Sequence, residues 1–344
     1  MAPVIKILDS HDLNPNDWDS YVMSHPFSDL YHLSGWGRII ESSYGHRSFY
    51  YVAKEENRIV GLFPVVCMEN FILGKRMVSL PYLDYGGICA DNEKIAHALL
   101  ETLQCCTVGS RNMVIDIRQR REMKLPLHRF GDKVTFILNL EKGPDYVWSV
   151  LGSGMRNHIR KAEKSGLTAE WGKREDLDHF YAVHTENMRF LGSPPHSLSF
   201  FRGIFFEFPD TRLILIRKND TVIGGGICLI FKDTFLVPWA SSLRKFGKTY
   251  PNYLLYWEVI RSACQEGLKR LDFGRSSIGS GTYLFKKQWA SIEEELFWQS
   301  NVGDGSVINP TNMKKVEYIA ELWKRFPLSL TRLIGPAIRK HISN

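Results

Sequence analysis

The amino-acid sequence predicts an α/β (α+β) protein with two tandem domains, mostly antiparallel mixed sheets and a helical C-terminal tail. Three observations lead to this prediction. The chain has 344 residues, which exceeds the usual size of a single hydrophobic core. Short segments of alternating apolar residues are interleaved with helical patterns, as in mixed α/β folds. A strand–turn–strand pattern also occurs once in each half of the chain, as a duplicated domain would produce.

The two strand–turn–strand patterns align without a gap. The first contains VAKEENRIVG and the second LIRKNDTVIG, so that Val52 falls on Leu215 and Gly61 falls on Gly224. Hairpins are common, so chance similarity stays open beside duplication. The four strands are predicted at residues 49–53, 59–68, 212–216 and 221–230.

The domain boundary is predicted near residues 138–150, where a strand and a turn precede a helical pattern. This gives an N-terminal domain at 1–140, a C-terminal domain at 141–300 and a helical tail at 301–344.

The tail contains two helical patterns, at 316–326 and 329–342, that carry both apolar and basic side chains. We expect these helices to pack against the second domain. Peripheral contact with the inner, anionic face of a membrane is the alternative interpretation.

The composition is that of a folded protein, with 44% hydrophobic and 24% charged residues. The sequence contains no apolar run of 18 residues, and its N-terminus lacks a basic stretch followed by an apolar one. We therefore expect a cytoplasmic protein without a membrane span.

The formal net charge of +7 and the pI of about 9.0 favour an anionic partner. An anionic small molecule or precursor, tRNA, coenzyme A and an anionic membrane face all satisfy this charge. We expect no DNA partner.

The six cysteines include no C-x-x-C pair, and the eleven histidines include no H-E-x-x-H pattern. Most of the cysteines lie in apolar patterns, which indicates buried free thiols. No Ser-His-Asp or Cys-His arrangement is evident, and we expect no metal.

The segment from Trp239 to Trp289 is the most informative about function. It predicts a strand, a basic turn that contains glycine, an amphipathic helix, a short strand ending in Asp-Phe-Gly, and a lysine pair among aromatic residues. Backbone N–H groups and fixed positive charge at a helix N-terminus suit a donor that carries phosphate.

Four parts of this segment resemble the second domain of Fem-type acyltransferases, which are two-domain relatives of the GNAT N-acyltransferases. They are Ala-Ser-Ser at 240–242, PNYLLYWE at 251–258, LDFG at 271–274 and Phe-Lys at 285–286. The resemblance covers about residues 25–290. It implies two GNAT-like domains with an intervening cleft. It is closest to stand-alone members, associated with bacterial exopolysaccharide and exosortase systems, that lack a coiled-coil arm.

The basic turn resembles the GNAT loop that binds acyl-coenzyme A, in which an arginine is followed by two closely spaced small residues. Arg244 and Gly247 match this loop, whereas Thr249 replaces the second small residue and its Cβ branch would crowd a pyrophosphate. A basic surface turn is the alternative. The resemblance implies these donor-binding residues: Ser241, Ser242, Arg244, Gly247, Lys248, Thr249 and Asn252.

Two catalytic residues are implied by the resemblance. Lys286 matches a family lysine thought to stabilise charge during transfer, which is a plausible role for an ammonium beside an oxyanion. Asp84, in the segment 79–87, matches an aspartate proposed to handle protons. A solvated loop lysine and a turn-capping aspartate are the alternatives.

The acceptor site is predicted at Arg38, Tyr82, Tyr85, Tyr253, Arg275 and Tyr283. Arg38 resembles the position of a family lysine that contacts acceptor phosphate. The segment 188–195 reads as a loop at the mouth of the cleft, and loops of this kind often select substrates. His184 and His196 are either bases or structural residues.

The sequence thus predicts an N-acyltransferase that moves an acyl or aminoacyl group to an amine of a cell-envelope precursor by direct attack. The co-substrate is either acyl-coenzyme A or aminoacyl-tRNA, and no cofactor is expected to be bound permanently. The acceptor stays open among an amino-sugar, a peptidoglycan precursor and an exopolysaccharide precursor. A non-catalytic scaffold in an envelope-polymer assembly is the alternative.

Overall fold

The computed structural model describes residues 4–9, 12–70, 74–107, 113–302 and 310–343, and it confirms the predicted fold class. The chain divides into two compact units. The first unit contains residues up to Asp132 together with 295–313 and 337–344. The second unit contains residues 133–294 together with 314–336.

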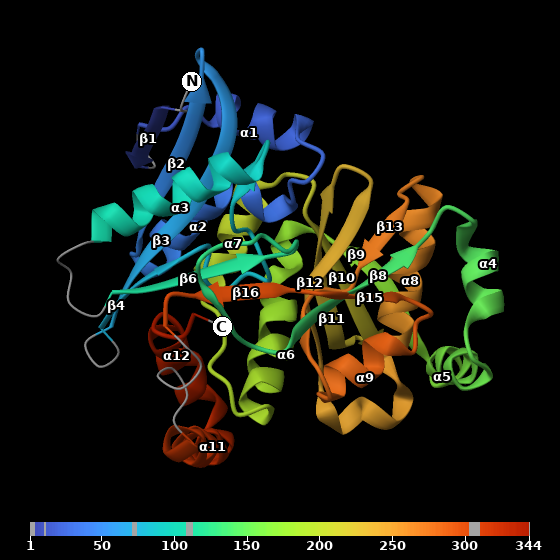
Figure 1. Ribbon diagram of the computed structural model, residues 1–344. Coiled ribbons are helices and arrows are strands. Elements are labelled where there is room, and N and C mark those ends of the chain that lie inside the picture. The colour runs from blue at the N-terminus through green and yellow to red at the C-terminus, as the bar shows by residue number, and fades with distance from the viewer. Residues whose placement is uncertain (1–3, 10–11, 71–73, 108–112, 303–309, 344) are drawn as a thin grey trace. The chain divides into compact units, whose positions relative to one another are not determined.

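Eight strands of the described chain form the sheet of the first unit (Figure 1), in the order β1-β2-β3-β4-β6-β16-β7, with β5 paired to β3. Only β4 and β6 run parallel among the described pairs. The strands are β1 (Val4–Asp9), β2 (Arg47–Glu55), β3 (Arg58–Asn70), β4 (Gly74–Val78), β5 (Cys89–Ala90), β6 (Val114–Gln119), β7 (His128–Arg129) and β16 (Phe297–Ser300).

Helices cover both faces of this sheet because its strands are apolar on both sides. Tyr51 belongs to the core cluster that contains Leu99 of α3. Tyr50, the preceding residue of β2, points the other way and meets the ring of Trp18 of α1 edge to face at 5.0 Å. The helical elements are α1 (Pro15–Ser24), η1 (Leu30–His32), α2 (Gly35–Tyr44) and α3 (Glu93–Thr107).

The sheet of the second unit also has eight described strands, in the order β14-β8-β13-β12-β11-β10-β9, with β15 paired to β8. Only β12 and β13 run parallel among the described pairs. The strands are β8 (Lys133–Asn139), β9 (Leu167–Gly172), β10 (Arg212–Lys218), β11 (Thr221–Phe231), β12 (Thr234–Ser242), β13 (Arg270–Asp272), β14 (Ser276–Ser277) and β15 (Ile292–Glu295).

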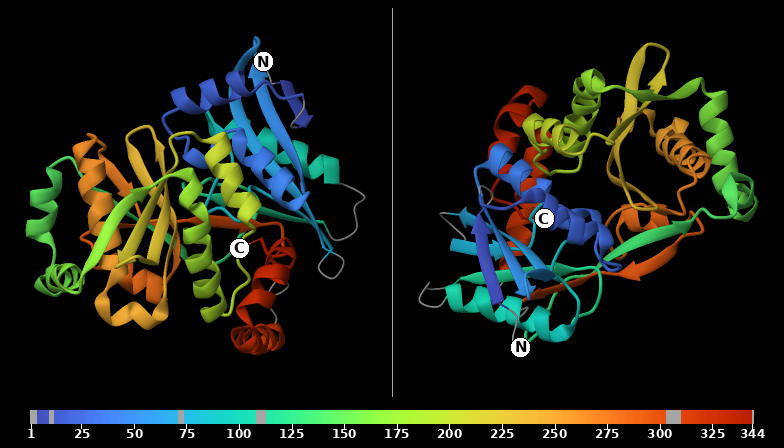
Figure 2. Two further views of the ribbon diagram at one scale, coloured as in Figure 1. Left: turned by 180° about the vertical axis from the view of Figure 1, so that it is seen from behind. Right: turned by 90° about the horizontal axis from the view of Figure 1, so that it is seen from above.

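Helix α8 packs on one face of the second sheet, and α6 packs on the other (Figure 2). Ile214 and Ile216 of β10 share a core cluster with Leu255 of α8. A Cβ at Gly225 would lie 3.2 Å from Phe180 of α6. The helical elements are α4 (Gly143–Val150), α5 (Ser153–Lys164), η2 (Arg174–Asp176), α6 (Leu177–Phe190), α7 (Leu198–Glu207), η3 (Arg244–Thr249), α8 (Pro251–Gln265) and α9 (Gly281–Lys287).

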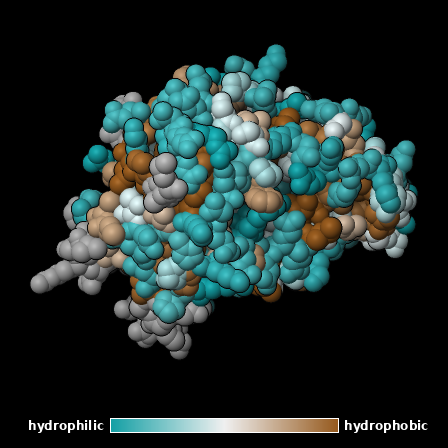
Figure 3. Space-filling view, turned by 45° about the horizontal axis from the view of Figure 1, so that its top comes forward, coloured by the Kyte–Doolittle hydropathy of each residue, from teal (hydrophilic) through white to brown (hydrophobic). Residues whose placement is uncertain are grey.

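The C-terminal helices are α11 (Pro310–Arg325) and α12 (Leu328–Arg339). Within the second unit, Trp323 of α11 is buried, and a Cβ at Gly335 of α12 would lie 2.6 Å from Pro195. No helix in the described ranges is both long and apolar enough to cross a membrane. The face seen in Figure 3 is mainly hydrophilic, with apolar side chains in separate clusters.

Candidate active site

A cavity of about 610 Å³ opens in the second unit where β12 ends. It is enclosed by the end of α6, the turn η3, the start of α8 and the helix α9. Its lining includes Asn187, Phe190, Ser241, Ser242, Arg244, Gly247, Asn252, Tyr253, Phe285 and Lys286.

The predicted basic turn that contains glycine is a 3₁₀ turn, η3. Its last residue, Thr249, donates a hydrogen bond from Oγ1 to the carbonyl of Phe246 at 2.7 Å, so the side chain turns back into the turn. Lys248 and Thr249 are not among the cavity-lining residues. The side chain of Thr249 is therefore turned away from this cavity. At Gly247, an added Cβ would meet no described atom within 4 Å, so the backbone there lies open.

The start of α8 brings an amide side chain into the cavity. Tyr250 adopts a left-handed conformation with φ of 57°, and Pro251 takes the first helical position, where its missing N–H costs no hydrogen bond. Asn252 follows, and its Oδ1 is buried without a hydrogen-bond partner among the described residues. A buried acceptor of this kind suits a donor group on a ligand.

Arg244 supplies the positive charge of the turn. It is exposed, and its guanidinium carbon lies 4.9 Å from the ring centroid of Phe190, a cation–π contact. Both residues line the cavity. The contact holds the guanidinium at the rim, where it can meet an anionic group of a donor.

Ser241 is linked to two side chains of α6. Asn187 Nδ2 donates to Ser241 Oγ at 3.3 Å, and His184 Nδ1 lies 3.3 Å from the same oxygen. Ser241 Oγ accepts from the amide nitrogen of Asn187, and the direction of its contact with His184 follows the tautomer of the imidazole. A serine that lines the cavity is therefore joined to a buried imidazole. The other predicted histidine, His196, is buried and stacks on Phe200 with ring centroids 4.6 Å apart.

Lys286 is buried at the C-terminal end of α9, with 7% of its surface exposed. Its Nζ donates to the carbonyls of Gly274 at 2.7 Å and Arg275 at 2.9 Å. These carbonyls are positioned by Asp272, which accepts hydrogen bonds from the Gly274 amide and from Thr135 Oγ1. The Asp-Phe-Gly segment at the end of β13 thus positions the ammonium group of Lys286.

Aromatic rings form part of the cavity wall. The rings of Tyr253 and Phe285 meet edge to face at 5.1 Å. Burial, together with the neighbouring Tyr250, raises the pKa of Tyr253, which keeps its hydroxyl protonated. Tyr283, also predicted for the acceptor site, is not among the lining residues, and its hydroxyl donates to Glu293 at 2.9 Å.

Four of the predicted site residues lie in the first unit: Arg38, Tyr82, Asp84 and Tyr85. Arg275 lies in the second unit and is not among the cavity-lining residues. Asp84 is half-buried, and its backbone carbonyl accepts a hydrogen bond from Trp298 Nε1 at 3.2 Å. Arg38 lies on α2 and donates to Ser34 Oγ at 3.4 Å. Tyr85 is buried and meets another tyrosine ring edge to face.

Tyr82 is buried as well, with 3% of its surface exposed. Its hydroxyl donates to the carbonyl of Lys340 at 2.8 Å and lies 2.9 Å from His46 Nε2. Burial, followed by the nearby Tyr44, raises the pKa of Tyr82. This hydroxyl therefore anchors the C-terminal segment around Lys340 within the first unit.

Sequence patterns alone did not identify the contribution of α6 to the cavity. Asn187 and Phe190 lie at the end of α6, so residues 188–190 of the predicted loop at 188–195 are helical instead. In the described part of the chain, no group of three or more His, Cys, Asp or Glu side chains is arranged to hold a metal ion.

Comparison with solved structures shows the same fold in proteins of low sequence identity. FemX has a TM-score of 0.66 and 14% identity, over 91% of this chain and 100% of that chain. L-PGS from Bacillus licheniformis has a TM-score of 0.57 and 12% identity, and the alignment covers 91% of this chain and 98% of that chain. A tandem GNAT protein from the clavulanic acid biosynthesis pathway has a TM-score of 0.53 and 9% identity, and the alignment covers 86% of this chain and 97% of that chain.

No curated protein sequence matches the chain. A family model described as an acetyltransferase (GNAT) domain matches residues 153–287, which is less than half of the chain but includes all of the cavity-lining residues. The protein therefore has a tandem GNAT-like fold, and residues 153–287 of its second unit match the acetyltransferase (GNAT) domain model.

Proposed function

We propose that this protein is an N-acyltransferase whose reaction takes place in the 610 Å³ cavity of the second unit. The observation that supports this most directly is the convergence of Arg244, Asn252, Ser241 and Lys286 on one cavity within the GNAT domain. The first two residues suit donor binding, and the last two suit charge and proton handling.

In the proposed reaction, an acceptor amine attacks the activated acyl carbon of the donor directly. A C–N bond forms, the carbonyl oxygen becomes an oxyanion, and the bond to the donor's leaving group then breaks. The ammonium of Lys286, held by two backbone carbonyls, stabilises the oxyanion or the leaving group. Fixing both reactants in one cavity supplies a further part of the rate.

The amine must lose a proton, and two residues are candidates to receive it. The sequence resemblance favours Asp84 of the first unit. Within the second unit, Ser241 Oγ contacts Nδ1 of His184. When this nitrogen is unprotonated, Ser241 can take the amine proton while it passes its own hydroxyl proton to the imidazole. We propose the Ser241–His184 pair as the relay and Asp84 as the rival assignment.

The finer identity of the reactants stays a proposal. The donor is acyl-coenzyme A or aminoacyl-tRNA. The acceptor is an amine of a cell-envelope precursor, and exopolysaccharide precursors are among the candidates. Arg38, Tyr85 and Arg275 remain the proposed acceptor contacts beside Tyr253. The competing proposal, a non-catalytic scaffold, predicts that no donor binds.

Calorimetry on the full chain tests the proposal with acetyl-coenzyme A, a longer acyl-coenzyme A and a charged tRNA at two salt concentrations. Saturable binding of coenzyme A that weakens about tenfold in Arg244→Ala supports an acyl-coenzyme A donor. Steeply salt-dependent binding of the tRNA alone supports aminoacyl transfer. Lys245→Ala is the matched control, because Lys245 is exposed and is not among the cavity-lining residues. Binding of neither donor contradicts the proposal.

We further propose that α11 and α12 contact an anionic membrane surface. In the second unit, Tyr318, Ile319 and Leu333 are 66%, 61% and 76% exposed, although all three are apolar or aromatic. Lys324 and Arg325 are exposed at the end of α11. Apolar side chains combined with basic ones are typical of helices that lie in a bilayer interface.

Co-sedimentation with vesicles that contain anionic lipid tests this contact. Leu333→Asp should weaken binding about tenfold or more, because burying a leucine contributes roughly 1.5–3 kcal/mol. Phe206→Asp is the matched control, since Phe206 is 71% exposed on α7. Equal binding by both variants contradicts the proposal.

A further inference from the structure

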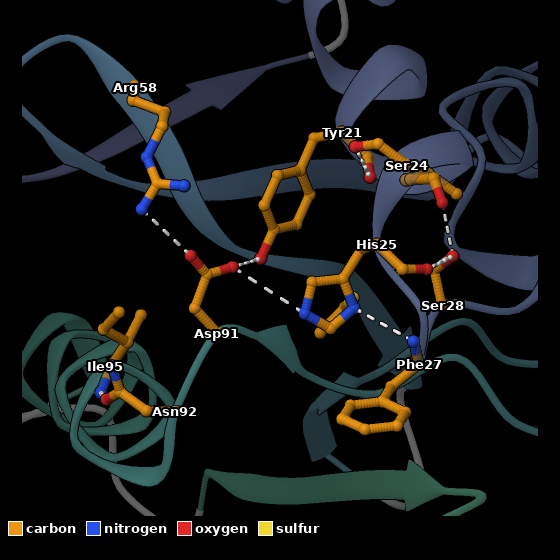
Figure 4. Close-up of polar contacts among 11 residues, drawn as sticks. Tyr21, Ser24, His25, Phe27, Ser28, Arg58, Asp91, Asn92 and Ile95 are labelled. Carbon is orange, nitrogen blue, oxygen red and sulfur yellow. Dashed lines mark hydrogen bonds and ion pairs between the residues drawn. The ribbon is translucent and has the colours of Figure 1, made fainter.

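The first unit contains a cysteine, a histidine and an aspartate in a line. Cys89 of β5 places its Sγ 3.2 Å from Nδ1 of His25, which lies directly after α1. On the other side of the ring, Nε2 of His25 lies 3.7 Å from Oδ1 of Asp91. Figure 4 shows the imidazole between Asp91 and the Phe27 amide. His25 is far from the other two residues in sequence, and the pairing of β5 in the sheet brings them together.

Hydrogen bonding fixes the protonation of the imidazole. The backbone amide of Phe27 donates to His25 Nδ1 at 3.2 Å, so this nitrogen is an acceptor at rest. The ring proton therefore sits on Nε2 and faces the carboxylate of Asp91. The thiol of Cys89 lies beside the basic nitrogen, which is the arrangement that lets an imidazole remove a thiol proton.

Asp91 is itself held in place. Tyr21 donates its hydroxyl proton to Oδ1 at 2.7 Å, and Arg58 pairs with Oδ2 at 3.3 Å (Figure 4). Burial and the hydrogen bond to Asp91 raise the pKa of Tyr21, so this donor keeps its proton. The carboxylate thus remains oriented toward the ring of His25.

Cys89 lines a cavity of about 240 Å³ although only 2% of its surface is exposed. Ile88, Ala96 and Met123 contribute apolar side chains to the same cavity. Most of its other lining residues are charged or polar: Asp29, His32, Asn92, Glu93, Gln119, Arg120, Arg121 and Glu122. This volume suits a short acyl chain. His25 and Asp91 also line a neighbouring cavity of about 710 Å³.

We propose that Cys89 is a nucleophile that accepts an acyl group from a thioester, with His25 as its base and Asp91 as a positioning residue. The thiol proton passes to His25 Nδ1 as the sulfur attacks the acyl carbon. The donor's C–S bond breaks, and the leaving thiolate takes the proton from His25. The products are S-acyl Cys89 and a free thiol, so one thioester replaces another and no further reactant is needed.

The donor class rests on the proposed function, but the site lies entirely in the first unit. The experiment therefore uses the full chain in the wild-type and Lys286→Met backgrounds. Each protein is incubated with S-acetyl-N-acetylcysteamine, a small thioester, and acetylation of each cysteine is followed by peptide mass spectrometry. If Cys89 is still acetylated in Lys286→Met, the nucleophile in the first unit acts independently of the reaction proposed for the second unit.

The other thiols of the same molecule are internal controls. Cys105 and Cys106 are exposed, whereas Cys228 is fully buried and burial raises the pKa of its thiol. An activated Cys89 should be acetylated at least about tenfold faster than Cys105 and Cys106 despite its burial. Slower acetylation than the exposed pair overturns the proposal, and this comparison needs no variant.

Variants of the base and the positioning residue provide the second readout. His25→Gln should slow acetylation of Cys89 by about 100-fold, the usual size of a general-base contribution. Asp91→Asn should slow it several-fold, and neither change should affect Cys105. An unchanged Cys89 rate in His25→Gln, with circular dichroism confirming the fold, overturns the assignment of the base.

Discussion

The hairpin β2–β3 of the first unit and the hairpin β10–β11 of the second share one pairing pattern. Ala53 pairs with Gly61, and the register shifts directly after Ala53. Ile216 pairs with Gly224, and the register shifts directly after Ile216. These are the positions that the ungapped alignment of the two sequences superimposes.

The two units differ in the connections beyond the hairpin. In the second unit, β12 ends at Ser242 and leads through η3 into α8, which places Asn252 in a cavity. In the first unit, β4 ends at Val78 and an irregular segment carries Asp84 instead. The same sheet scaffold therefore supports different chemistry, because the connection after the strand decides which side chains converge.

The largest expected effect is on kcat, and it distinguishes Lys286 from the neighbouring Lys287. Lys286→Met should lower kcat by about 100- to 1000-fold, the usual loss when an oxyanion donor is removed. Lys287→Met should stay near wild type, because the Lys287 side chain is 60% exposed. Steady-state kinetics with the donor identified by calorimetry checks this. If the free energy of unfolding falls as much as activity does, the role of Lys286 is structural.

The next effect asks which unit supplies the proton acceptor. If Ser241 and His184 form the relay, His184→Gln should lower kcat by about 100-fold, which steady-state kinetics measures. Asp84→Asn should then have a small effect. The opposite result, with a loss in Asp84→Asn alone, would move proton transfer to the first unit.

A smaller effect compares the two aligned glycines. A Cβ at Gly61 would lie 2.6 Å from Ile95 Cγ2, so Gly61→Ala should cost about 1–3 kcal/mol through overpacking. At Gly224 the nearest atoms would be 3.4 Å away, so Gly224→Ala should change stability by less than about 0.5 kcal/mol. Urea denaturation measures both. Equal losses would show that the two hairpins are packed alike.

The smallest effect concerns pH. Burial lowers the pKa of His46 and of His32, both in the first unit. Below the unfolded pKa of about 6.5, the unfolded chain binds more protons than the folded one, so stability falls as pH drops. Hydrogen exchange from pH 7.5 to 5 should show earlier loss of protection in the first unit. Earlier loss in the second unit would contradict this.

Much of the fold was predictable because apolar periodicity reports directly on burial. The alternating strands and the glycine at each register shift were visible as local patterns. The predicted residues Arg244, Asn252 and Lys286 line one cavity because they lie within a short stretch that folds as strand, turn and helix.

The features that the sequence did not reveal depend on contacts between distant segments. The link from His184 to Ser241 spans 57 residues, and that from His25 to Cys89 spans 64. The backward hydrogen bond of Thr249 depends on the 3₁₀ conformation of its turn, which no residue pattern predicted.

The order in which the chain visits the two units limits how the protein can be divided. The chain passes to the second unit after Asp132, returns at Glu295, leaves again after Met313 and returns once more at Ala337. A fragment that begins at residue 141 would lack β8, the partner of β13, β14 and β15. Neither half is one continuous piece of sequence, so we expect isolated halves to expose unpaired strand edges and aggregate.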